Sequence, residues 1–213
     1  MDAISPLIGP LWQGLQVTLR ITLGAALLAI PLAVLAGLAR LSGQRWLRMI
    51  STVYVEVFRG TSALVQLFWF YFVLPMFGVR LPAILVGIVV LALNAGAYGA
   101  EVVRGAIQAV PSGQREAGVA LNFTRRQIMR RIILPQALPA MLPPAGNLLI
   151  ELLKNTALVS LITITDLTFR GQLLRSETLQ TTEIFSIMLL MYFAVALCIT
   201  AAVRWLERRV RIQ

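Results

Sequence analysis

The stretch GAIQAVPSGQREAGVALNFTRRQIMRRIILPQALP, residues 105–139, decides how the chain is organised, because it is long and polar and lies between strongly apolar segments. Within it, the Pro-Ser-Gly break at residues 111–113 predicts the start of a helix. Helical spacing is carried by small or apolar residues, namely Ala117, Ala120, Leu121 and Ile128. We expect Glu116 in the first turn of this helix, where a carboxylate suits the helix dipole.

One face of the expected helix carries only small side chains. Ala117, Gly118 and Ala120 leave this face smooth, which permits close approach of a partner protein. The arginine pairs 125–126 and 130–131 then mark the return to the membrane. The residues alone leave two interpretations open: a helix that docks on a partner protein, or a basic amphipathic helix that rests on anionic lipid.

The segments on both sides are apolar enough to cross a bilayer. Of the 213 residues, 58% are hydrophobic and 13% are charged, whereas a soluble domain is about one quarter charged. Five apolar segments are long enough to span, at about 11–41, 49–77, 81–103, 132–167 and 184–203. The sequence therefore predicts an all-α polytopic membrane protein with about five transmembrane helices. We expect one domain over residues 1–213, with a cytoplasmic loop at about 105–135.

Prolines interrupt the fourth apolar segment at positions 135, 139, 143 and 144. Membrane helices tolerate proline, but a cluster of this kind favours a break. We therefore expect a broken helix here, with freed backbone groups near Pro143–Asn147 that could line a cavity.

The arginines predict the orientation of the chain in the membrane. Thirteen fall within the stretches 40–48, 104–131 and 204–211, whereas the opposite connections carry three, at 80, 170 and 175. Because Lys and Arg stay on the cytoplasmic side, this bias places the N-terminus outside and the C-terminus in the cytoplasm. It also explains the net charge of +10 without a nucleic-acid partner. The N-terminus lacks the basic start of a signal peptide, so we expect the first helix to be retained.

Several chemistries are disfavoured by the composition. The chain has no His and a single Cys, Cys198, which removes Ser-His catalysis, an internal disulfide and a Cys or His metal cluster. It also lacks the G-x-x-x-x-G-K-[ST] phosphate-binding loop. We therefore expect no catalytic residue, no metal site and no cofactor on this chain, and we disfavour a membrane enzyme. Any ATP-driven step needs a partner.

Ionisable residues inside apolar segments mark a candidate translocation path. A charge at the centre of a membrane helix costs about 2.5–3.5 kcal/mol on insertion scales, so such groups face a cavity or each other. The candidates are the charged Glu101, Glu151 and Lys154 and the neutral Asn94, Tyr98, Asn155, Thr156 and Ser160. Together they suit a zwitterion. Their spacing of three also allows purely structural pairs, Glu151 with Lys154 and Glu101 with Arg104, and an interfacial pair, Glu56 with Arg59.

Several separated motifs resemble those of bacterial ATP-binding-cassette importer permeases. The loop residues Glu116-Ala117-Gly118, then Asn122, then Ile132 with Leu134 and Pro135, are similar to the EAA loop of that family. The family pattern has Ala where this chain has Gly118 and Gly where it has Asn122. Asn tolerates a left-handed backbone, so we expect the turn to survive. Residues 56–66, 93–98, 101–107, 111–114 and 152–160 resemble the polar-amino-acid permease subfamily, so the likeness covers about residues 10–205.

The resemblance implies a transport mechanism with separate partners. It places the loop helix in a groove of an ATPase subunit that carries ATP and Mg. The residues it assigns to coupling are Glu116, Ala117, Gly118, Ala120, Leu121, Asn122, Leu134 and Pro135. It further implies a second permease chain (identical or related), an extracytoplasmic solute-binding protein, membrane lipid and a bacterial inner membrane location.

The resemblance also implies import of a polar amino acid or a similar zwitterion. The alternatives that remain are a compatible solute such as ectoine, an opine, and a passive channel or scaffold, which would leave the loop helix without a purpose.

Overall fold

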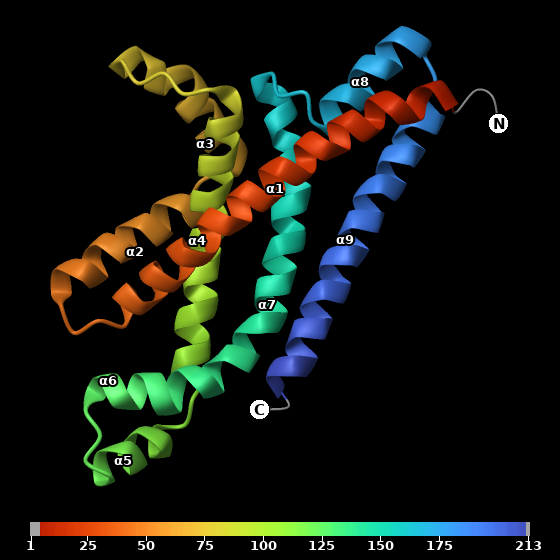
Figure 1. Cartoon of the computed structure of the whole chain (residues 1–213). Coiled ribbons are helices and arrows are strands. Elements are labelled where there is room, and N and C mark those ends of the chain that lie inside the picture. The colour runs from red at the N-terminus through yellow and green to blue at the C-terminus, as the bar shows by residue number, and fades with distance from the viewer. Residues whose placement is uncertain (1–4, 212–213) are drawn as a thin grey trace.

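The computed structural model describes residues 5–211, and every regular element in this range is helical (Figure 1). The first half contains α1 (Ser5–Arg40), α2 (Arg45–Gly60), α3 (Ala63–Phe68), the π turn η1 (Trp69–Val73), the 3-10 turn η2 (Leu74–Phe77) and α4 (Ala83–Gln108). The second half contains α5 (Ser112–Ala120), α6 (Arg125–Ile128), the π turn η3 (Met129–Ile133), α7 (Leu134–Asn155), the 3-10 turn η4 (Thr156–Ile162), α8 (Leu167–Thr178) and α9 (Thr181–Arg211).

Four helical runs in the described chain are long and apolar enough to span a membrane, at 6–40, 83–108, 125–162 and 181–210. The predicted all-α polytopic class is therefore confirmed. The segment 49–77, which we expected to be one apolar span, forms two helical pieces bent by 104° between Gly60 and Ala63. Counted as one broken span, this pair brings the total to the five that were predicted.

The proline-rich part of the fourth apolar segment is not broken, contrary to the prediction from its prolines. α7 runs continuously through Pro139, Pro143 and Pro144, and Pro135 lies in its first turn. A proline in the first turn removes an N–H that has no partner inside the helix. Farther along, membrane helices in general tolerate proline without a break. The local adjustment is the π turn η3, which directly precedes α7.

The helices α1 and α4 pack closely against each other through small residues. A Cβ added at Gly99 would lie 2.6 Å from Cβ of Ala33, far below a normal contact. Ala25 and Ala29 of α1 and Ala92 of α4 are buried in the largest apolar cluster, together with Val90. Small residues let membrane helices approach until their backbones are in contact, which gains dispersion energy where no hydrophobic effect operates.

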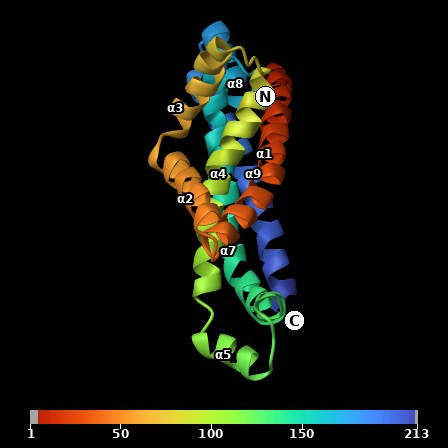
Figure 2. The ribbon, with the colours of Figure 1, turned by 90° about the vertical axis from the view of Figure 1, so that its left-hand side faces the viewer.

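The molecule has two chemically different ends. The start of α1 and α8 lie at one end, and α5, α6 and the C-terminal end of α9 lie at the other (Figures 1 and 2). A separate apolar cluster joins the elements at each end: Leu11, Leu167 and Ile184 at the first, and Ile107, Ile128 and Ile133 at the second. The helix α5 therefore protrudes from an end that is itself well packed (Figure 2).

Candidate functional site

The protruding loop is a short helix followed by a tight reversal. α5 ends at Ala120, and Asn122 takes a left-handed conformation with φ of 60°. The backbone N–H of Asn122 donates to the carbonyl of Val119 (2.9 Å), and that of Phe123 donates to the carbonyl of Gly118 (3.0 Å). This confirms the prediction of a left-handed turn at Asn122. The expected single helical pattern up to Ile128 is therefore divided into α5 and α6.

A capping box restarts the helix after the turn. The hydroxyl of Thr124 accepts from the backbone N–H of Gln127 (3.3 Å), and the Gln127 side chain accepts from the backbone N–H of Thr124 (2.8 Å). This reciprocal arrangement satisfies two of the donors that every helix start leaves free. The direction of α6 relative to α5 is thus fixed by local hydrogen bonds.

The exposed and buried faces of α5 differ from the prediction in two details. Glu116, Ala117, Ala120 and Leu121 are exposed, as a docking surface requires. Gly118, however, is the buried residue of α5, and an added Cβ would lie 2.8 Å from Cγ1 of Ile128 and 3.0 Å from Cδ1 of Ile132. Gly118 therefore holds α5 against the following helix and does not belong to the smooth outer face. Glu116 lies in the second turn of α5, because the helix begins at Ser112.

Leu134 and Pro135 connect the loop to the membrane-spanning part. Leu134 is half-buried and packs with the cluster that contains Ile107, Ile133 and Ala137. Pro135 is exposed at the start of α7. The loop thus packs against α4 and α7, so a displacement of α5 would be transmitted to these two long helices through packed side chains.

A small cavity lies between α4 and α7. It is lined by Leu91, Asn94, Ala95 and Tyr98 of α4 and by Leu148, Glu151, Leu152 and Asn155 of α7. The structure thus brings together four of the residues predicted for a translocation path. The cavity measures about 10 Å³, room for about one water molecule. It is therefore much smaller than the roughly 300–1,000 Å³ typical of ligand pockets.

One wall of this cavity is fixed by Asn94 and by Gln66, a residue that the sequence did not single out as a site. The Asn94 amide donates to the carbonyl of Phe58 (3.0 Å) and to Oε1 of Gln66 (3.3 Å). The Gln66 amide donates to the carbonyls of Phe58 (2.9 Å) and Thr61 (3.2 Å) and to the Thr61 hydroxyl (2.8 Å). These bonds satisfy the backbone groups that the bend between α2 and α3 leaves without helical partners. The signal available in the sequence was a glutamine inside an apolar segment, five residues after Thr61.

Glu101 belongs to an ion network and does not line the cavity. Its carboxylate pairs with Arg104 (2.7 Å), as the spacing predicted, and with Arg40 of α1. Glu56 of α2 lies 3.7 Å from Arg40, so the expected pair of Glu56 with Arg59 is replaced by a contact across helices. The network links α1, α2 and α4 through the side chains of Arg40, Glu56 and Glu101.

Arg59 lies over the ring of another predicted path residue. Its guanidinium carbon is 5.2 Å from the centre of the Tyr98 ring, a cation–π distance. Because Tyr98 also lines the cavity, this contact brings a positive charge from α2 close to the cavity wall.

The remaining path candidates lie elsewhere on the α7–η4 run. Lys154 is exposed, and within residues 5–211 it makes no ion pair with Glu151, so the structural pair that the spacing allowed is not formed. Thr156 and Ser160 are buried and donate back to the carbonyls of Leu153 (2.6 Å) and Ala157 (2.8 Å). Their hydroxyls are thereby used to stabilise the tight η4 turn.

At the opposite end, Asp166 fixes the start of α8. Its carboxylate accepts from the backbone N–H groups of Phe169 (2.9 Å) and Thr168 (3.3 Å). The backbone N–H of Leu167 donates to the Thr18 hydroxyl of α1 (3.1 Å). Asp166 is fully buried and lies outside the spanning helices, and burial raises the pKa of its carboxyl to about 6. No group of three or more His, Cys, Asp or Glu side chains that could hold a metal occurs within the part of the chain that the structure describes.

The chain matches known membrane transport proteins along nearly its whole length. Residues 29–212 match the family described as binding-protein-dependent transport system inner membrane component. A probable amino-acid ABC transporter permease of Sinorhizobium fredii is 45% identical over 209 residues, covering 95% of this chain and 88% of that protein. The glutamine transport system permease of Escherichia coli is 37% identical over 213 residues, which cover 99% of this chain and 97% of that protein.

The fold is similar to a solved transporter. The structure described as an amino acid ABC transporter with histidines has a TM-score of 0.88 and 36% identity, covering 98% of this chain and 96% of that one. Fold and matches define a class: a multi-pass membrane subunit that takes part in transport and is not itself an enzyme. The chain belongs to the family of inner membrane components of binding-protein-dependent transport systems.

Proposed function

We propose that this chain is a permease subunit of a bacterial ATP-driven importer that moves a polar amino acid into the cytoplasm. Two relatives carry amino-acid and glutamine transport in their descriptions, and the similar solved structure is an amino acid transporter. The observation that carries the proposal is the exposed helix α5, held at one end of the molecule by the Asn122 turn and the buried Gly118.

The proposed coupling site is the outer face of α5. Glu116, Ala117, Ala120 and Leu121 are free to enter a groove on a separate ATPase subunit, which would hold ATP and Mg. Leu134 and the packing of Gly118 would transmit movement of α5 to α4 and α7. The excess of arginine at this end supports a cytoplasmic position for α5 and the C-terminus, with the N-terminus outside.

The proposed path runs along the α4–α7 cavity. The Glu151 carboxylate suits an ammonium group, and the Tyr98 hydroxyl and Asn155 amide supply donors for a carboxylate. The exposed charges of Glu151 and Lys154 are costly against lipid, which supports a second permease chain, identical or related, on this face. An extracytoplasmic solute-binding protein would deliver the solute at the α8 end. A compatible solute or an opine would fit the same zwitterion chemistry.

A charge reversal on α5 tests the proposal directly. With Glu116→Lys, we expect loss of ATPase co-purification with the tagged permease and loss of uptake, because a new cation enters the docking face. The matched control is Glu183→Lys at the start of α9, at the opposite end, which should leave ATPase co-purification unchanged. Normal co-purification and uptake with Glu116→Lys would refute the docking role. Recovery of the wild-type chain without any ATPase, even after crosslinking, would favour a channel or scaffold.

A further inference from the structure

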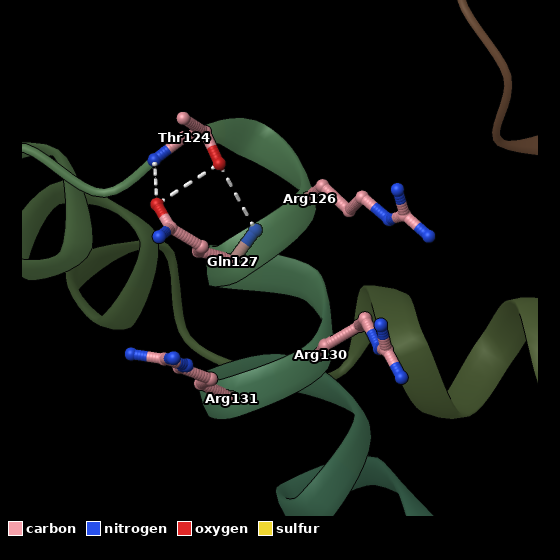
Figure 3. Close-up of a pocket in the computed structure, with 5 residues that line it drawn as sticks. All are labelled: Thr124, Arg126, Gln127, Arg130 and Arg131. Carbon is pink, nitrogen blue, oxygen red and sulfur yellow. Dashed lines mark hydrogen bonds between the residues drawn. The ribbon is translucent and has the colours of Figure 1, made fainter.

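A basic pocket lies beside α6, at the same end of the molecule as α5. It has a volume of about 570 Å³ and is lined by Thr124, Gln127 and the arginines 126, 130 and 131. Arg126 and Arg130 are one helical turn apart and project to the same side, whereas Arg131 projects to the other (Figure 3). Arg131 lies near the Phe123 ring, 5.9 Å from its centre. Two guanidinium groups therefore lie on one side of the helix.

Arg126 and Arg130 have no acidic partner in the part of the chain that the structure describes. The ion pairs within residues 5–211 all involve Arg40 or Glu101, in a different part of the molecule. Thr124 and Gln127 are engaged with each other in the capping box (Figure 3). The pocket thus presents concentrated positive charge and five-donor guanidinium groups, which match the geometry of a phosphate group.

An apolar groove continues directly from the basic pocket. It has a volume of about 850 Å³ and shares Arg130 as a lining residue. Its walls are side chains of spanning helices, including Val34 and Leu38 of α1 and Leu138 and Met141 of α7. Leu138 is 48% exposed and Val34 is 41% exposed, so the groove is open to the surroundings of the helices. A basic mouth and an apolar interior form one continuous surface.

We propose that this surface binds one anionic phospholipid from the membrane leaflet on the α5 side. The phosphate lies between Arg126 and Arg130, and an acyl chain lies in the groove between α1 and α7. An amphiphile satisfies both parts at once, because the charged part lies at the ends of the spanning helices and the apolar part lies at membrane depth. Basic pockets between transmembrane helices bind anionic headgroups elsewhere by the same physics. The proposal rests on the proposed function only for the identification of this leaflet as the cytoplasmic one.

Native mass spectrometry of the purified full-length permease in detergent tests this assignment. The delipidated permease is titrated with dioleoyl phosphatidylglycerol and, separately, with dioleoyl phosphatidylcholine. We expect the wild type to prefer phosphatidylglycerol by about tenfold. Both lipids carry a phosphodiester, but the choline ammonium of phosphatidylcholine adds a positive charge that the two guanidinium groups repel. Arg126→Gln with Arg130→Gln should abolish this preference. The matched control, Arg45→Gln with Arg48→Gln, removes two exposed charges outside the pocket and should keep it.

A second variant tests the groove without touching the arginines. Leu138→Gln should weaken binding of the dioleoyl lipid but not of dihexanoyl phosphatidylglycerol, whose short chains barely enter the groove. Three results would overturn the proposal: no lipid preference in the wild type, equal loss of preference in both arginine pairs, or displacement of the lipid by millimolar inorganic phosphate. Crosslinks from position 138 to a second permease or to the ATPase, in place of lipid, would also overturn it. Because lipid binding is read without transport, a failed docking role for α5 would not be mistaken for a failed lipid site.

Discussion

At the scale of single residues, polar side chains lie where the backbone needs a partner. Asp166 caps α8 from a fully buried position, and Asn122 takes the left-handed conformation that ends the α5 reversal. Both side chains are short and polar, and both residues lie where the regular backbone hydrogen bonds of a helix begin or end. Each supports a prediction that depends on one side chain.

Asp166 makes stability depend on pH. Its pKa is about 6 in the folded chain and 3.8 when unperturbed, so the folded state holds the proton more tightly between these values. The contribution of Asp166 to stability is therefore greatest below about pH 4, falls by about 3 kcal/mol as pH rises to about 6, and is constant above that. Asp166→Asn keeps one of the two capping bonds, from the backbone N–H of Phe169 to Oδ1, and has no buried charge, so it should be more stable than the wild type at pH 7. Thermal unfolding of the detergent-solubilised complex from pH 4 to 8 measures this; equal pH slopes for both proteins would contradict it.

Asn122 determines how the loop reverses direction. Asn122→Gly should preserve or improve ATP-coupled uptake, because glycine adopts a positive φ without strain. Asn122→Val should cost about 1–2 kcal/mol locally, because a β-branched residue resists this conformation. Uptake and ATPase co-purification distinguish the two. Total loss of coupling with Asn122→Gly would show that the Asn side chain itself, and not the turn, is required.

At the scale of elements, the bend between α2 and α3 is stabilised by amide side chains from two directions. Gln66 comes from α3 and Asn94 from α4, and both donate to the carbonyl of Phe58. A bend of 104° removes several helical hydrogen bonds at once. Without these amides, polar backbone groups would be left unsatisfied next to the cavity.

Gln66→Leu should therefore destabilise the assembled protein by about 1–3 kcal/mol, because the Thr61 carbonyl and the buried Asn94 amide each lose their Gln66 partner. The Phe58 carbonyl keeps its donor, Asn94. The change can be followed as a lower melting temperature of the complex in detergent. Gln172→Leu, on the exposed face of α8, is the matched control and should stay within about 0.5 kcal/mol of the wild type. Equal melting temperatures for all three proteins would show that water replaces the Gln66 amide.

Sequence patterns predicted the elements better than their directions. Hydropathy identifies residues 49–77 as apolar but carries no information on the turn at Gly60, because that turn depends on a buried Gln66 and a distant Asn94. The prolines of α7 predicted a break, but the helix runs through Pro139, Pro143 and Pro144. The cavity was partly predictable, since Asn94, Tyr98, Glu151 and Asn155 are polar residues in apolar segments. Glu101 carries the same signal, and only the position of Arg40 on another helix shows that it is paired.

At the scale of the whole molecule, charged side chains are grouped in three separate places. The Glu101 network joins α1, α2 and α4, the arginines of α6 form the basic pocket, and the cavity with Glu151 lies between α4 and α7. Within residues 5–211, Glu151 forms no ion pair, which makes its carboxylate available to a solute. An unpaired carboxylate inside a membrane protein is a functional hypothesis by default.

Glu151→Gln should reduce uptake of a zwitterionic amino acid by about tenfold or more, because a charge-assisted bond to the ammonium group becomes a neutral one. Assembly with the ATPase should be unchanged, since the structure shows no ion pair for Glu151. Lys154→Gln on the same helix is the comparison and should have a smaller effect. Solute uptake and co-purification are measured side by side. Loss of assembly with Glu151→Gln would assign the residue a structural role instead.

The close contact of α1 and α4 has a practical consequence for spectroscopy. With Gly99 and Ala33 already at the limit of approach, these two helices have no free space in which to slide or rotate independently. Probes attached to their outer faces should keep one fixed separation through the whole turnover cycle. Such a pair gives an internal ruler against which the travel of every other helix can be calibrated.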